Sequence, residues 1–199
     1  MKNIIVVAIV IFGLLSFFLY NSGYFNDHYK IPNFEMERLQ SILEDAIQVD
    51  DLETIIPTVQ SYQHIPDTKT SIIIFTPQES FCKSCSGIAF FDKTIRDYYH
   101  FSGSSISNYP ITDRHKKING QKYLILLMDN RKANVHSFQV KYLGKSKTFY
   151  PGQDFFVGLM KVEKLYDKAS YSFYNQENKN ITDNVASLFP SDVNNSISE

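Results

Sequence analysis

Two uninterrupted apolar runs most constrain what this chain can fold into. Residues 71–75 read Ser-Ile-Ile-Ile-Phe, and residues 123–128 read Tyr-Leu-Ile-Leu-Leu-Met. Both runs are short and rich in residues that favour strands, which is typical of strands buried inside a sheet. Ser170–Tyr174 alternates between polar and aromatic side chains and indicates a third strand. We expect these three segments to be strands of one sheet.

Helical spacing separates the predicted strands. Apolar side chains recur every three or four residues after the first strand, at Ile88, Phe91, Ile95 and Tyr98. This spacing predicts an amphipathic helix. Residues 133–143 and 154–162 predict two further helices. An order of strand, helix, strand, helix and strand predicts an α/β fold, with a mixed central sheet flanked by helices.

The two cysteines, Cys82 and Cys85, form the only chemically reactive pair in the sequence. They lie between the first predicted strand and the predicted helix. The orphan N–H groups and the positive dipole end of a helix N-terminus favour a thiolate there, and Lys83 adds a cation. Two thiols at this spacing can close a disulfide and open it again. The pair therefore predicts a redox role in which both cysteines are catalytic.

Two other interpretations of the cysteine pair stay open. The disulfide can be structural, in a module that binds a partner without catalysis. The pair can also supply two soft ligands to a metal, but the five histidines show no ligand spacing that would complete a site. We predict no metal and no cofactor. A net charge of −1 also argues against a nucleic-acid partner.

Residues 71–99 combine an apolar strand, Phe81, the two cysteines and an amphipathic segment. This combination resembles the thioredoxin superfamily, specifically the membrane-anchored thiol–disulfide oxidoreductase-like proteins of the bacterial envelope, and the resemblance covers residues 69–181. It implies a thioredoxin-like fold in which Cys82 is the attacking thiolate and Cys85 the resolving thiol. It also implies that the partners are protein thiols and disulfides of the envelope.

The sequence departs from that family at two positions. The family's cis-proline, which faces the dithiol, falls at about Ala169, and the tryptophan that commonly precedes the first cysteine is Phe81. These departures predict weak activity on generic substrates and a narrow range of partners.

The N-terminus carries the second informative pattern. Residues 4–20 contain no charged side chain, and Lys2 precedes them. Such a run is at the short edge of a membrane span, and the preceding positive charge places the N-terminus in the cytoplasm. We expect residues 1–22 to form an uncleaved signal anchor, with a cleaved signal peptide as the alternative. This predicts a single-pass protein of the inner (cytoplasmic) membrane with an extracytoplasmic, periplasmic C-terminal domain.

The rest of the chain is predicted to have three parts. Residues 23–66 form a stalk and a helical extension, in which Asn33 can cap a helix. Residues 67–190 form the thioredoxin-like domain, and residues 191–199 form a flexible tail. Within the domain, residues 102–119 read as a polar loop. Its basic run at 114–117 either contacts an anion or an acidic partner or is a solvated part of the loop.

Overall fold

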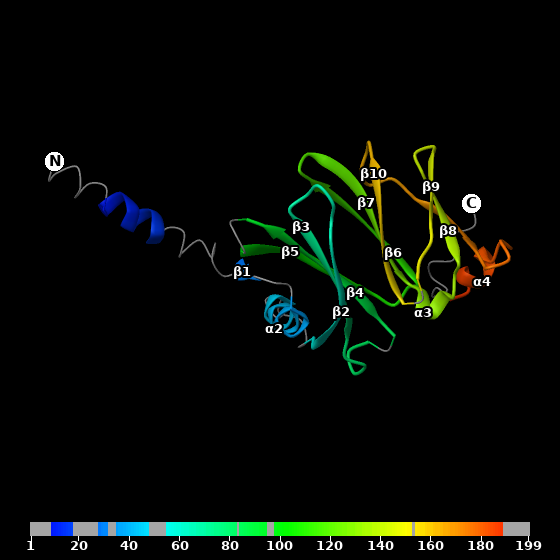
Figure 1. Ribbon diagram of the computed structural model, residues 1–199, viewed down its shortest axis with the longest axis horizontal. Helices are drawn as coiled ribbons and strands as arrows, with labels where there is room; N and C mark the ends of the chain where they lie inside the picture. Colours follow the sequence, from blue (N-terminus) through cyan, green and yellow to red (C-terminus); the bar gives the residue numbers. More distant parts are fainter. Residues whose placement is uncertain are drawn as a thin grey trace.

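The computed structural model describes residues 9–17, 28–31, 35–47, 55–82, 84–94, 98–152 and 154–188. Antiparallel strands in three sheets make up most of this part of the chain (Figure 1). Residues 9–17 are helical. Further helices within these ranges are α2 (Met36–Ile47), α3 (Asn130–Ala133) and α4 (Thr182–Ala186).

The five-stranded sheet has the order β1-β5-β4-β3-β2, and its neighbouring strands are antiparallel. Its strands are β1 (His28–Lys30), β2 (Pro57–His64), β3 (Thr70–Pro77), β4 (Ser86–Lys93) and β5 (Tyr98–Ser107). Consecutive strands from β2 to β5 pair with one another, so this part of the sheet is a simple meander.

Two three-stranded antiparallel sheets follow along the chain. The middle sheet has the order β10-β7-β6 and consists of β6 (Ile111–Ile118), β7 (Gln121–Asp129) and β10 (Phe155–Val162). The outer sheet has the order β11-β8-β9 and consists of β8 (Ser137–Tyr142), β9 (Lys145–Phe149) and β11 (Ser170–Tyr174).

These elements stack in the order α2, five-stranded sheet, middle sheet and outer sheet (Figure 1). α2 covers one face of the five-stranded sheet, where Leu39 and Phe91 belong to one apolar core. The opposite face of that sheet packs on the middle sheet, and Ile72 and Ile125 belong to this second core. A third core lies between the middle and outer sheets.

The position of β7 between two other sheets explains why its apolar run is uninterrupted. Successive side chains of a strand point to opposite faces. Tyr123, Ile125 and Leu127 join the core against the five-stranded sheet. The alternate residues join the core against the outer sheet, and they are Leu124, Leu126 and Met128. A strand in the middle of three stacked sheets is therefore apolar at every position.

The predicted α/β, thioredoxin-like fold is wrong. The apolar runs at 71–75 and 123–128 are strands with both faces buried, as expected, and Ser170–Tyr174 is also a strand. However, they lie in β3, β7 and β11, and thus in three different sheets rather than one. Other sheets cover both faces of β7. In β3, the helix α2 covers one face and the middle sheet covers the other, so neither strand has helices on both faces. The sheets are antiparallel throughout, whereas a mixed sheet was predicted.

Three predicted helices are also strands. The segment after the cysteines is β4, residues 133–143 contain β8, and residues 154–162 contain β10. In β4, Ile88 and Phe91 belong to cores on opposite faces of the sheet. A spacing of three residues fits one face of a helix, but it also fits a strand that is buried on both faces. Ile95 lies outside the described residues.

The helix predicted within the extension at residues 23–66 is confirmed as α2. The buried residues of this helix are Leu39, Leu43, Ala46 and Ile47. The proposed cap, Asn33, lies outside the described residues. The predicted polar loop at 102–119 is not a loop, because it contains the end of β5 and all of β6.

The predicted membrane anchor is also corrected. Residues 9–17 are helical, and the other residues of the predicted anchor at 1–22 lie outside the described part of the chain. None of the helices in the described ranges has both the length and the apolar character that a bilayer crossing requires. This finding contradicts the predicted single-pass anchor in the inner membrane and the periplasmic location that depended on it.

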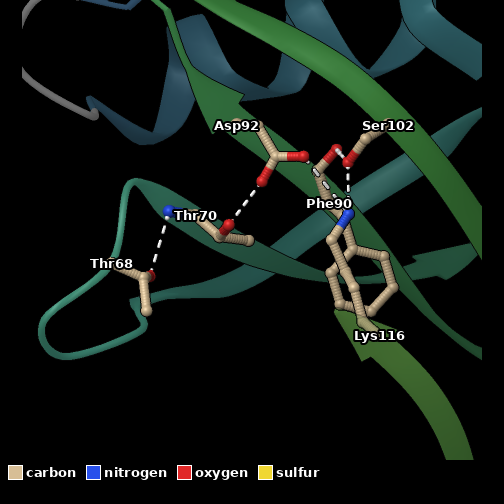
Figure 2. A network of polar contacts seen from close by, with 6 residues as sticks. All are labelled: Thr68, Thr70, Phe90, Asp92, Ser102 and Lys116. Carbon is tan, nitrogen blue, oxygen red and sulfur yellow. Dashed lines mark hydrogen bonds and ion pairs between the residues drawn. The ribbon is translucent and has the colours of Figure 1, made fainter. Parts of the chain in front are cut away.

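A polar network ties the five-stranded sheet to the middle sheet (Figure 2). Lys116 of β6 places Nζ 3.3 Å from Oδ2 of Asp92 on β4, and the same ammonium donates to the Ser102 hydroxyl at 2.6 Å. Thr70 donates to the other oxygen of Asp92, and the Lys116 ammonium lies 4.8 Å from the centre of the Phe90 ring. Burial would raise the pKa of Asp92, but the Thr70 hydroxyl and the Lys116 charge outweigh it and hold the pKa below its ordinary value.

We expect Lys116→Met to lower the free energy of unfolding by about 1–2 kcal/mol, because Asp92 and Ser102 lose a charged donor and the Phe90 ring loses its ammonium, while Met keeps an apolar side chain of similar length. Denaturant unfolding measures this change. Lys117→Met is the matched control, since Lys117 is the neighbouring residue and is exposed. Equal losses in the two variants would show that the network does not stabilise the packing of the two sheets.

Candidate functional site

The cysteine pair lies in the connection between β3 and β4, where Cys82 and Cys85 form a disulfide. The N–H groups of Phe81 and Cys82 donate to the Gln78 carbonyl oxygen at 3.1 and 3.3 Å. Gln78 is held in turn by Ile56, because its N–H donates to the Ile56 carbonyl at 3.0 Å and its side-chain oxygen accepts from the Ile56 N–H at 2.5 Å. The cysteine loop is therefore anchored to the start of β2.

The surroundings of the two cysteines differ from those predicted. Cys85 is 6% exposed and comes directly before β4, whereas Cys82 is half-buried and Phe81 is exposed. The element that follows Cys85 is a strand, so no helix dipole favours a thiolate at Cys82. Lys83 lies outside the described residues. The main physical reason for an activated Cys82 is thus removed.

A groove of about 490 Å³, which neither cysteine lines, lies where parts of the three sheets meet. Residues 111–115 of β6 form one wall, residues 167–171 at the start of β11 form another, and Ile106 and Tyr109 close a third side. Because successive residues of a strand point to opposite faces, a groove that contacts all of residues 111–115 follows the edge of the strand. β6 is the last strand of the middle sheet, so this edge has no strand partner within the described ranges.

A hydrogen bond between two sheets fixes the groove. The Tyr171 hydroxyl of β11 donates to Oδ2 of Asp113 on β6 at 2.7 Å. Burial raises the pKa of Tyr171 well above its ordinary value, and the charge of Asp113 and the hydrogen bond act in the same direction. Tyr171 therefore stays protonated at physiological pH, and its hydroxyl donates to one of the two oxygens of the Asp113 carboxylate.

A second set of hydrogen bonds fixes the chain that leads to β11. The Tyr142 hydroxyl donates to the Lys164 carbonyl oxygen and accepts from the Asp167 N–H, both at 3.0 Å. Nε2 of His115 lies 3.0 Å from the same hydroxyl. Since the single proton of Tyr142 is already used, Nε2 of His115 must be the donor. β6, β8 and the segment before β11 are therefore held together behind the groove.

The charged side chains that line the groove are two cations and two carboxylates, of which the cations are the more exposed. Arg114 projects from β6, and its guanidinium donates to the Asp113 carbonyl oxygen at 3.2 Å. Lys168 is exposed on the opposite wall. The two acidic groups of the groove are engaged within the protein, because Asp113 accepts from Tyr171 and Asp167 accepts from the Lys168 N–H at 2.9 Å. Both donors are neutral, so the two carboxylates keep their negative charge and the groove lining carries charges of both signs.

The sequence pointed to parts of this groove for other reasons. The basic run at 114–117 was predicted to lie in a polar loop, and Ala169 was the position expected for the family's proline. Both Arg114 and Ala169 line the groove. The strand β6 itself was missed because it is polar on both faces. The turn Asn119-Gly120 could have revealed it, since both residues have positive φ, 49° and 79°. An Asn-Gly pair before an apolar run is a strong hairpin signal.

A second concentration of charge lies at the end of β7. Asp129 is fully buried and accepts from Nε and Nη2 of Arg131 at 3.0 and 2.9 Å, and Nζ of Lys132 lies 3.1 Å away. Burial would raise the pKa of Asp129, but the Arg131 hydrogen bonds and the Lys132 charge hold it below its ordinary value. The carboxylate is saturated by its own neighbours, so we regard the cluster as structural. In the described part of the chain, no group of three or more His, Cys, Asp or Glu side chains could hold a metal ion.

The chain matches no protein-family model, no curated protein and no solved structure at a significant level. Nothing in these comparisons identifies a member of the thioredoxin superfamily. Function is therefore inferred from the groove and the cysteine loop themselves rather than from a relative.

Proposed function

We propose that the protein is a binding module that holds a ligand in the groove along β6, and that Cys82–Cys85 is a structural disulfide. The observation that carries the proposal is the groove itself, which combines a strand edge without a strand partner in the described ranges, apolar walls and charged side chains of both signs. Its volume of about 490 Å³ lies within the usual range for ligand sites, which are mostly apolar with a few polar groups.

The cysteine loop supports the structural role of the disulfide. Its backbone is anchored through Gln78 and Ile56, and Cys85 is buried at the start of β4. The two cysteines are three positions apart, and closing so short a loop stabilises a fold by about 2 kcal/mol in the chain-entropy account. The disulfide therefore holds the β3–β4 connection in one conformation.

Thiol–disulfide exchange is the second candidate, and the partial exposure of Cys82 favours it. In that reaction the Cys82 thiolate attacks a disulfide of a partner protein and releases one partner thiolate. Cys85 then attacks the mixed disulfide and releases the second partner thiolate. The partner is reduced, and the Cys82–Cys85 pair is oxidised.

Removal of the disulfide separates the two candidates. For a structural disulfide, we expect the double variant Cys82→Ala, Cys85→Ala to lose about 2 kcal/mol of unfolding free energy. Reduction of the unaltered protein with dithiothreitol is expected to cause the same loss. Denaturant unfolding with and without the reductant measures both changes.

The single variants provide the control. After incubation with glutathione disulfide, the exchange reaction requires Cys85→Ala to accumulate a mixed disulfide at Cys82 and Cys82→Ala to accumulate little. Because Cys82 is half-buried and Cys85 is buried, access alone favours an adduct at Cys82, so the asymmetry is decisive only together with the stability of the double variant. A marked asymmetry, detected by mass spectrometry, together with unchanged stability in the double variant, would favour exchange and contradict the structural role.

A further inference from the structure

The outer edge of β2 is closed by a side chain of α2, which lies beside the start of this strand (Figure 1). β2 is the last strand of the five-stranded sheet, and no strand pairs with its outer side in the described ranges. We propose that Gln40 is an autoinhibitory plug, whose side-chain amide occupies this edge and prevents β2 from pairing with β2 of a second copy of the chain. This inference concerns a different edge from the groove along β6 and does not depend on the proposed binding function.

The Gln40 amide makes the contacts that an added strand would make. Its NH₂ group donates to the Pro57 carbonyl oxygen, and its oxygen accepts from the Val59 N–H at 2.8 Å. Along an edge strand of an antiparallel sheet, alternate residues turn their backbone groups away from the neighbouring strand. Pro57 and Val59 are alternate residues, so Gln40 satisfies two groups on the outer side of β2. A residue of a paired strand would use the same carbonyl and the same N–H.

Neighbouring contacts fix the orientation of this amide. The Gln40 NH₂ group also donates to the Glu44 carboxylate at 2.6 Å, one turn further along α2. An NH₂ group that faces two acceptors and an oxygen that faces a donor are satisfied in only one orientation of the amide. The buried side chains of Leu39 and Leu43 hold the same helix on the sheet. The plug is therefore held both by its own hydrogen bonds and by the packing of α2.

Other features of β2 also discourage pairing at this edge. Pro57 has no N–H to offer to a partner strand. The register of β2 with β3 shifts between Val59 and Ser61, so the strand has an irregularity directly after the plug. A bulge of this kind bends a strand and increases its twist, which turns the rest of the edge away from a straight partner. The proline, Gln40 and the bulge thus act on the same short segment.

A comparable contact closes a second edge. β10 is an edge strand of the middle sheet, and the Lys147 ammonium of β9 donates to its Leu159 carbonyl oxygen at 2.8 Å. Unpaired edges are templates for association with another chain, and natural proteins block them with charged side chains, bulges and covering elements. A second copy is the occupant that such a block must exclude, because the same edge is present on every copy and can pair with itself about a two-fold axis.

Two variants of the full chain test the plug. Gln40→Ala removes the amide, and Gln40→Met removes it while keeping a side chain of similar length and good helix propensity. Mass spectrometry follows hydrogen exchange of the segment that contains Val59 from about 5 μM to about 500 μM protein, and sedimentation equilibrium gives the association state. At the lowest concentration we expect the Val59 amide to exchange at least about tenfold faster in both variants than in the unaltered protein. As the concentration rises, its protection should return and a dimer should form.

Ser41→Ala is the matched control, because Ser41 is the next residue of α2 and is exposed. We expect the Val59 segment of this variant to exchange as in the unaltered protein at every concentration. In the dimer of either Gln40 variant, isotope-filtered nuclear Overhauser effects between labelled and unlabelled copies are expected to connect β2 with β2. Thermal unfolding of each variant confirms that it is folded.

Three results would overturn the proposal. If the Val59 amide keeps its protection in both variants at low concentration, Gln40 is not the group that covers this edge. If both variants stay monomeric at about 500 μM with the Val59 amide unprotected, Gln40 only anchors α2 to the sheet. A dimer in which the two copies contact each other away from β2 would show that loss of the plug does not open this edge to a second copy.

Discussion

Replacing Phe91 with alanine is expected to lower the free energy of unfolding by about 3–5 kcal/mol, the usual range for a large aromatic side chain removed from a core. Phe91 is completely buried between the five-stranded sheet and α2. Its ring centre lies 5.9 Å from that of Tyr29 and 5.5 Å from that of Phe101, so the truncation also removes two aromatic contacts. Denaturant unfolding of Phe91→Ala and the unaltered protein gives the difference.

Phe81→Ala is the matched control for this prediction. It makes the same chemical change, but Phe81 is 37% exposed in the cysteine loop. We expect a loss below about 1 kcal/mol, since surface substitutions rarely exceed that scale. If Phe91→Ala lost no more than Phe81→Ala, the packing of α2 on the five-stranded sheet would be wrong.

Phe91 also shows which parts of the fold the sequence could predict. Its burial was predicted correctly, but on the face of a helix. In β4 the core on one side contains Ile88 and the core on the other contains Phe91, so the strand has no polar face to mark its period of two. A strand that is apolar on both faces and a buried helix leave the same short apolar pattern, and the number of residues between Ile88 and Phe91 fits both.

The apolar runs that became β3 and β7 were easier to assign, because short runs made almost entirely of β-branched, aliphatic and aromatic residues indicate a buried strand. What covers such a strand is set by residues far away in the sequence. Here β7 is covered on both sides by other sheets. Phe138 on one side comes from a segment that was predicted as a helix, and Ile72 on the other comes from a segment that was predicted as a strand of the same sheet as β7. Local pattern therefore identified strands but not the layers.

The sequence predicted which cysteines pair, but not the structural setting of the pair or the existence of the groove. The disulfide partners were evident, because the chain has only two cysteines. Their presumed activation depended on a helix that the structure replaces with β4. The groove depends on a contact between Asp113 and Tyr171, which are 58 positions apart, and on the edge of β6. No local spacing predicts such a pair, although Asn119-Gly120 could have revealed the hairpin that carries Asp113.

Replacing Asp129 with asparagine is expected to lower the free energy of unfolding by about 3 kcal/mol at neutral pH. The carboxylate is buried, and it accepts two hydrogen bonds from Arg131 and lies 3.1 Å from the Lys132 ammonium. In the variant, the NH₂ group of the asparagine amide would face the N–H groups of Arg131, and two donors cannot form a hydrogen bond. Lys132, whose side chain is only 19% exposed, would also lose its counter-ion. Denaturant unfolding at pH 7 measures the loss, and Glu163→Gln, which removes an exposed partner of Lys145, is expected to change little.

The effect of Asp129→Asn should also depend on pH, in a direction fixed by the pKa of Asp129. Burial opposes ionisation of this carboxyl, but the Arg131 hydrogen bonds and the Lys132 charge prevail, so the folded protein has the lower pKa. A carboxyl with a lower pKa in the folded state adds stability above its unfolded pKa, about 3.9, and that stability is lost as the pH falls toward the folded pKa. The difference between the two proteins should therefore be constant above about pH 5 and shrink below about pH 4. A difference that grows on acidification would show that Asp129 is not held ionised by its two cationic neighbours.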